Sequence, residues 1–71
     1  MTYYHIYGVD EMFSSLRSAK KYVWQHYTQD ERKKYLAGSS IVKIVNNEVV
    51  TITPIIVYED GYTFAKTYKN G

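Results

Sequence analysis

The hydrophobic pattern of the chain changes twice, and each change marks a predicted element. The stretch Thr2–Val9 is rich in Tyr and Ile and has Gly8 near its end, which predicts a strand followed by a turn. From Ser15 to Tyr27 the apolar residues instead recur at helical spacing, with Ser14 before them as a candidate N-cap. We therefore expect a first strand and then an amphipathic helix over Ser15–Tyr27.

The helical pattern breaks near Thr28. In a continuous helix, Asp30 and Glu31 would turn onto the apolar stripe, because each residue advances by about 100°. The segment from Thr28 to Glu31 has the form of a capping box, and Gly38 suits the position just after a helix C-terminus. This predicts a second, short helix over about Gln29–Ala37.

A run of β-branched residues after Ser40 predicts a strand that enters a tight hairpin at Asn46–Asn47. A turn shifted by one residue is the alternative, and it would move every side chain to the other face. The expected partners across the hairpin are Ile44 with Val49 and Val42 with Thr51.

The C-terminal third predicts a further hairpin. Pro54 cannot donate to a strand ladder, so Val49–Tyr58 is expected to be an edge strand, a bulged strand or two pieces that meet at the proline. Asp60–Gly61 predicts a type I′ turn, because both central residues of that turn need positive φ. This turn would join Ile55–Glu59 to Tyr62–Tyr68.

The predicted order is strand, helix, short helix and three strands in one α+β domain, residues 1–71, since so short a chain cannot build two cores. The economical arrangement has two layers: an antiparallel sheet packed on one face by the amphipathic helix and the short second helix. The pattern leaves open where the first strand lies in the sheet and which face is covered. The stretch Phe13–Val23 resembles the helix that follows a short strand in many small bacterial and phage-encoded α+β proteins, a likeness of style that assigns no binding residue.

Composition narrows the class of protein. Charged residues make up 23% and hydrophobic residues 45% of the chain, which suits neither a disordered tail nor a membrane segment. No apolar run approaches the roughly 18 residues of a spanning helix, and no signal-peptide pattern is present, so we expect a soluble protein of the cytoplasm. The sequence has no cysteine, which excludes a disulfide framework, thiol catalysis and Cys-based zinc sites.

The sequence shows no group of residues with the spacing of a catalytic or metal-binding motif. His5 and His26 lack metal-ligand spacing, and the acidic residues stand at predicted helix starts and turns, where their role is structural. The serines match no nucleophile elbow, and no glycine-rich phosphate loop is present. We expect a protein that is not an enzyme and that uses no cofactor and no metal.

Basic residues gather beside an indole on the predicted helices. Arg17 and Lys21 lie four residues apart on one ridge of the first helix. Lys20 and Trp24 flank that ridge, and such a strip can hold phosphate and stack a base, although a solvated helix face has the same composition. The candidate nucleic-acid contacts are Arg17, Lys20, Lys21, Trp24, Arg32, Lys33 and Lys34.

Apolar residues occupy both faces of the predicted meander. Between Ile41 and Val57 they fall on both parities, so a sheet covered on one face would leave apolar surface exposed. Association of two copies would bury this surface and enlarge a small core. Pro54 and Lys43 discourage pairing at an edge, so contact through a sheet face is favoured. The candidate self-association residues are Val50, Ile52, Ile56 and Tyr58.

Two functional hypotheses follow. The first is a small interaction module that acts as a homodimer or by contact with another protein, for which nine tyrosines provide rings with polar tips. The alternative is a nucleic-acid-binding module, although a net charge of +2 is only mildly basic.

Overall fold

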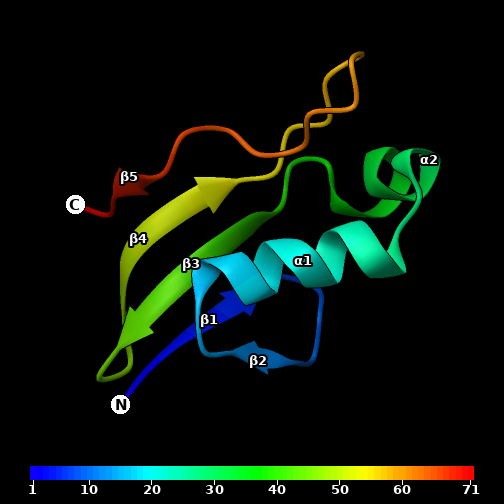
Figure 1. Cartoon of the computed structure of the whole chain (residues 1–71). Helices are drawn as coiled ribbons and strands as arrows, with labels where there is room; N and C mark the ends of the chain where they lie inside the picture. The colour runs from blue at the N-terminus through cyan, green and yellow to red at the C-terminus, as the bar shows by residue number, and fades with distance from the viewer.

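The computed structural model describes all residues, 1–71, and shows a five-stranded antiparallel sheet with two helical segments (Figure 1). This confirms the predicted α+β class. The sheet order is β2-β1-β3-β4-β5. The elements are β1 (Thr2–Ile6), β2 (Met12–Phe13), α1 (Leu16–His26), α2 (Gln29–Glu31), the π-helical turn η1 (Arg32–Leu36), β3 (Ser40–Val45), β4 (Glu48–Pro54) and β5 (Tyr68–Lys69).

The first strand is shorter than predicted and lies between β2 and β3. β1 ends at Ile6 because the chain turns there: the Val9 amide donates to the Ile6 carbonyl at 3.0 Å, and Gly8 has φ +89°. The prediction of a strand to Val9 was therefore wrong, and the sequence pattern also missed β2. Met12 and Phe13 pair back onto β1 before the helix starts.

The long helix matches its predicted range, but its cap is one residue further on than expected. The Ser15 hydroxyl accepts from the Ser18 amide at 3.1 Å, and the Ser18 hydroxyl accepts from the Ser15 amide at 3.3 Å. Ser15, rather than Ser14, is thus the N-cap, in a reciprocal pair that satisfies two amides at the start of α1.

The second helical segment begins at the predicted capping box. The Thr28 amide donates to Glu31 Oε1 at 2.8 Å, and the Glu31 amide donates to Thr28 Oγ1 at 3.2 Å. The segment does not continue as one α-helix, because α2 passes into the wider turns of η1. Gly38 follows with φ +89°, as a residue after a helix C-terminus does.

The hairpin of β3 and β4 turns at the predicted residues, with φ values of 51° at Asn46 and 69° at Asn47. Ile44 pairs with Val49 as expected. The register then shifts next to Lys43, and the predicted pairing of Val42 with Thr51 is wrong: Val42 lies opposite Ile52. A β-bulge inserts one extra residue on the β4 side.

The C-terminal segment makes less sheet than predicted. The stretches 55–59 and 62–67 meet in an isolated bridge between Ile55 and Phe64, and β5 has only two residues. The turn between them is not type I′, because Gly61 has φ +91° but Asp60 has no positive φ. The Gly61 amide donates to the Tyr58 carbonyl at 3.0 Å, which is a type I turn closed by a glycine bulge. Figure 1 shows this hairpin projecting past the end of the sheet.

One cluster of buried side chains joins the helices to the sheet. Ala19 and Val23 of α1 pack in it, and α1 crosses β1 and β3 (Figure 1). Ile6 and Ile41 are cross-strand partners and so lie on the same sheet face, toward this cluster. The cluster consists of Ile6, Val9, Ala19, Val23, Leu36, Ile41, Ile55 and Phe64.

Candidate functional site

The sheet face opposite Ile6 and Ile41, here called the outer sheet face, carries no Asp, Glu, Lys or Arg in its paired part, and it is called uncharged with histidine counted as neutral at pH 7. Side chains alternate between faces, so the registers of the strand pairs place one residue of each strand in a continuous row across this face. The row runs Met12, His5, Val42, Ile52 and Tyr68. Tyr3, Ile44 and Val49 form a second row beside it.

The outer sheet face is not evenly exposed along its central row. Val42 at its centre is fully buried and yet does not belong to the core cluster. Its row partners His5 and Ile52 are half-buried, and the ends of the row are open, with Met12 exposed by 67% and Tyr68 by 53%. The face therefore has a dry centre and an exposed apolar or aromatic side chain at either end.

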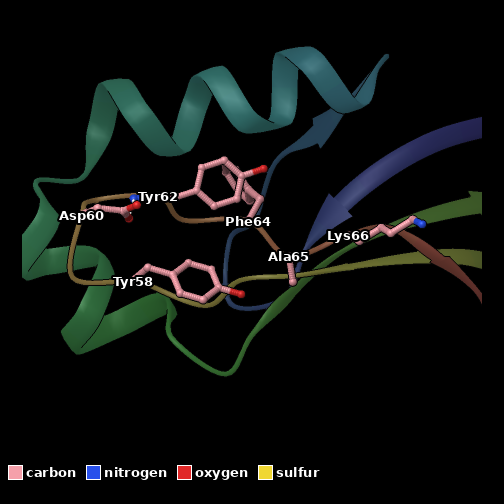
Figure 2. Close-up of a pocket in the computed structure, with 6 residues that line it drawn as sticks. All are labelled: Tyr58, Asp60, Tyr62, Phe64, Ala65 and Lys66. Carbon is pink, nitrogen blue, oxygen red and sulfur yellow. Dashed lines mark hydrogen bonds between the residues drawn. The ribbon is translucent and has the colours of Figure 1, made fainter.

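The second candidate site is a shallow depression of about 490 Å³ in the C-terminal hairpin, here called the aromatic pocket. Its volume lies in the range of roughly 300–1,000 Å³ that is usual for small-ligand sites. Figure 2 shows Asp60 at one end and Lys66 at the other, with the rings of Tyr58 and Tyr62 between them. The lining residues are Tyr58, Asp60, Tyr62, Phe64, Ala65 and Lys66.

The hairpin backbone holds the two tyrosines together. The Tyr58 amide donates to the Tyr62 carbonyl at 2.8 Å, and the Tyr62 amide donates to Asp60 Oδ1 at 3.0 Å. The two ring centroids lie 5.9 Å apart, with the planes inclined by 38°. Both rings are about half exposed, 43% for Tyr58 and 58% for Tyr62, so a planar ligand can reach them.

Helix α1 lies beside this site and contacts its lining residue Phe64. Figure 2 shows Tyr62 and Phe64 beneath the helix. Lys20 Nζ lies 5.2 Å from the centroid of the Phe64 ring, and the edge of Trp24 meets the same ring at a centroid distance of 6.5 Å. Two of the residues proposed from the helical ridge thus border the aromatic pocket, which the sequence did not connect to them.

Arg32 has a structural position that differs from the predicted nucleic-acid contact. Its side chain is only 5% exposed, and its guanidinium carbon lies 4.1 Å from the centroid of the Trp24 ring. Nη1 donates to the Tyr27 carbonyl at 2.7 Å, while the buried Nε has no hydrogen-bond partner. Arg32 therefore links η1 to the C-terminal end of α1, and its guanidinium is almost inaccessible to a nucleic acid.

The remaining basic candidates are exposed. Arg17 and Lys21 continue the ridge of α1 beyond Lys20. Lys33 and Lys34 lie on η1, where Lys34 Nζ is 5.3 Å from the ring centroid of Tyr35.

The self-association candidates do not gather at one site. Ile52 lies in the central row of the outer sheet face, and Val50 lies at the bulge beside it. Ile56 follows the paired part of β4 and is 44% exposed. Tyr58 belongs to the aromatic pocket.

Sequence reasoning missed several residues of both sites. Met12 escaped notice because the two-residue strand β2 has no periodic signal of its own. The shared parity of Tyr62, Phe64 and Lys66 was visible in the sequence, but only the bend of the hairpin against α1 makes it a pocket.

A separate aromatic cluster lies near the start and end of α1. The rings of Tyr22 and His26 stack with centroids 4.1 Å apart, and Phe13 meets Tyr22 at 5.2 Å. Partial burial, together with the charges of Glu11 and of ionised Tyr27, raises the pKa of Tyr22 above its ordinary value of 10.0. This tyrosine therefore stays neutral at physiological pH and serves as packing.

No family model, no curated protein and no solved structure matches the chain. None of its helices has the length and apolar character needed to cross a membrane. No group of three His, Asp or Glu side chains is placed to hold a metal ion.

Proposed function

We propose that this protein is a non-enzymatic interaction module that associates with a second copy of itself through the outer sheet face. The observation that carries the proposal is the uncharged row from Met12 to Tyr68, which crosses all five strands. A polar outer face is the usual pattern for a sheet with one solvated side, so five successive uncharged positions favour a contact.

A second copy suits this face better than a charged partner. Two copies related by a two-fold axis bring the same patch of each copy together, so a patch with charges of one sign would repel its copy, whereas an uncharged patch would not. The charged side chains of the central strands lie on the other face, where Lys43 pairs with Tyr4 and Thr51. The neutral face is therefore self-complementary in charge.

The size of the face predicts a weak dimer. With strands about 4.8 Å apart and about 6.6 Å between residues on the same face of a strand, the eight residues of the two rows cover roughly 250 Å². That is about a twentieth of the 4898 Å² accessible surface of one chain. Two such patches bury roughly 500 Å² in total, which is well below the 1,200–2,000 Å² of stable complexes and suits a weak, transient contact. The dry centre around Val42 lowers the gain further, because part of the apolar area is already covered.

The test places a charge at the exposed end of the row. Tyr68→Arg changes a residue that is 53% exposed, so the monomer fold tolerates it, but a dimer would bury the added cation. Tyr35→Arg is the matched control, because Tyr35 is 62% exposed and lies on η1, away from the sheet.

Sedimentation velocity over about 5–500 µM detects weak association of the kind that a small contact produces. We expect the parent chain and Tyr35→Arg to shift toward the mass of two chains as concentration rises, and Tyr68→Arg to remain at one. A constant mass of one chain for the parent, or equal dimerisation of both variants, would refute the proposal.

A further inference from the structure

The aromatic pocket joins three features that no local sequence pattern connects. Two exposed tyrosine rings are held in place by the hairpin hydrogen bonds of Tyr58 and Tyr62. Lys66 stands at one end of the pocket, and the ammonium of Lys20 lies over Phe64 in its wall. The site therefore presents aromatic faces and the cation of Lys66, and a second cation, Lys20, lies on the helix that contacts its Phe64.

From this arrangement we infer that the aromatic pocket and the adjoining ridge of α1 bind single-stranded nucleic acid, with a base stacked on Tyr58 and Tyr62 and phosphates held by Lys20 and Lys66. Stacking on aromatic side chains beside a cationic groove is how single strands are bound without sequence preference. The ligand, the surface and the residues differ from those of the self-association contact, so each proposal can fail without the other.

The distribution of charge indicates the path of the phosphate backbone. The carboxylate of Asp60 lies at the tip of the hairpin and repels phosphate, whereas Lys66 lies at the opposite end (Figure 2). The phosphate backbone is therefore expected along α1, where Arg17 and Lys21 extend the ridge next to Lys20. Arg32 takes no part, because its guanidinium is buried against Trp24.

The flanking cations set the expected salt dependence. Two to four phosphates neutralised by Lys20, Lys66, Arg17 and Lys21 give a slope of about −1.4 to −2.8 in log affinity against log salt for a single strand. Raising salt from about 50 to 200 mM should then weaken binding roughly 7- to 50-fold. A duplex, whose bases cannot reach the tyrosines, should bind more weakly at each salt concentration.

The experiment measures the fluorescence anisotropy of labelled oligonucleotides of about 12 nucleotides, a length that covers the site, as single-stranded DNA, single-stranded RNA and duplex DNA. Tyr62→Ala should weaken single-strand binding roughly 5- to 150-fold with little change in salt slope, because it removes a stacking face. Tyr62→Phe keeps the ring and should retain the affinity. Lys66→Ala should reduce the slope by about 0.7.

Matched controls lie outside the site. Tyr35→Ala and Lys33→Ala remove an exposed ring and an exposed cation of η1, and they should leave binding unchanged. Tyr68→Arg should also keep single-strand binding whether or not it abolishes self-association. Far-UV circular dichroism of each variant tests whether it is folded. If Tyr62→Ala does not fold, the change in salt slope of Lys66→Ala tests the inference instead.

Several results would overturn the inference. One is the absence of single-strand binding at low salt up to about 100 µM protein, the weak limit of non-specific binding. A second is equal affinity for duplex and single strand. A third is equal affinity for poly-glutamate and single-stranded DNA, which would show that the protein responds to negative charge alone. Unchanged binding by Tyr62→Ala and Lys66→Ala with loss in Lys33→Ala would move the site to η1 and refute the pocket.

Discussion

Replacing Arg32 by alanine distinguishes a structural arginine from a phosphate contact. The substitution removes the hydrogen bond of 2.7 Å from Nη1 to the Tyr27 carbonyl, a charged interaction that contributes about 1.5–3 kcal/mol. It also removes the stacking on Trp24 at 4.1 Å, which contributes about 0.5–2 kcal/mol.

Two further contributions to the free energy of unfolding have opposite signs. Loss of the buried aliphatic stem costs about 1–2 kcal/mol, since each buried methylene contributes about 0.8 kcal/mol. Removing the unpartnered Nε relieves about 1–3 kcal/mol of desolvation. The combined effect is a destabilisation of about 2–4 kcal/mol, a large part of the stability of a domain this size.

Thermal unfolding followed by circular dichroism measures this change. We expect Arg32→Ala to lower the melting temperature by roughly 10–25 °C, because 1 kcal/mol corresponds to about 4–8 °C in a domain of this length. Arg32→Met keeps most of the stem and should cost only about 1–2 kcal/mol, since the polar losses are offset by removal of Nε. The emission of Trp24, the only tryptophan, should shift to the red in both variants.

Lys33→Ala changes the next residue, which is exposed, and should stay within about 0.5 kcal/mol of the parent. If Arg32→Ala changes the free energy of unfolding as little as Lys33→Ala does and leaves the Trp24 emission unchanged, Arg32 does not stabilise the packing of η1 against α1.

Three other substitutions test individual parts of the fold by urea denaturation. Val23→Ala, at a fully buried position of the core, should cost about 2–3 kcal/mol, and a loss below 1 kcal/mol would contradict the packing of α1. Thr28→Ala removes the cap on the Glu31 amide and should cost about 1 kcal/mol; an unchanged midpoint would show that the capping box adds nothing. Asn47→Gly should stabilise the hairpin by a few tenths of a kcal/mol, whereas Asn47→Ala should cost about 1 kcal/mol because its φ is 69°, and the opposite order would exclude the positive-φ turn.

The sequence predicted those features that depend on neighbouring residues. The capping box at Thr28, the positive φ of Asn46 and Asn47 and the chain reversal at Gly38 were all correctly located. Each arises from contacts or dihedral preferences within about four residues, so the local pattern contains the needed information. The helix over Ser15–Tyr27 follows from the same locality, since its apolar stripe repeats within each turn.

Errors began where pairing over longer distances decides the structure. The position of β1 between β2 and β3 and the existence of β2 depend on pairing partners up to 43 residues away, such as Thr2 with Val45. The bulge that moves Val42 opposite Ile52 is a second case, because sequence alternation continues unchanged through it. The segment 62–67 alternates like a strand but lacks a regular partner.

The candidate sites show the same division. Exposed basic residues beside Trp24 on α1 could be placed from the helical wheel, as could the apolar character of both strand faces. Only the tertiary structure showed that Arg32 is buried, that Lys20 contacts Phe64 and that residues of five strands align in one uncharged row. Helices, caps and turns are determined by interactions between neighbouring residues. Burial and cross-strand register arise from residues that meet only once the chain has folded, and burial and register decide which side chains a partner can reach.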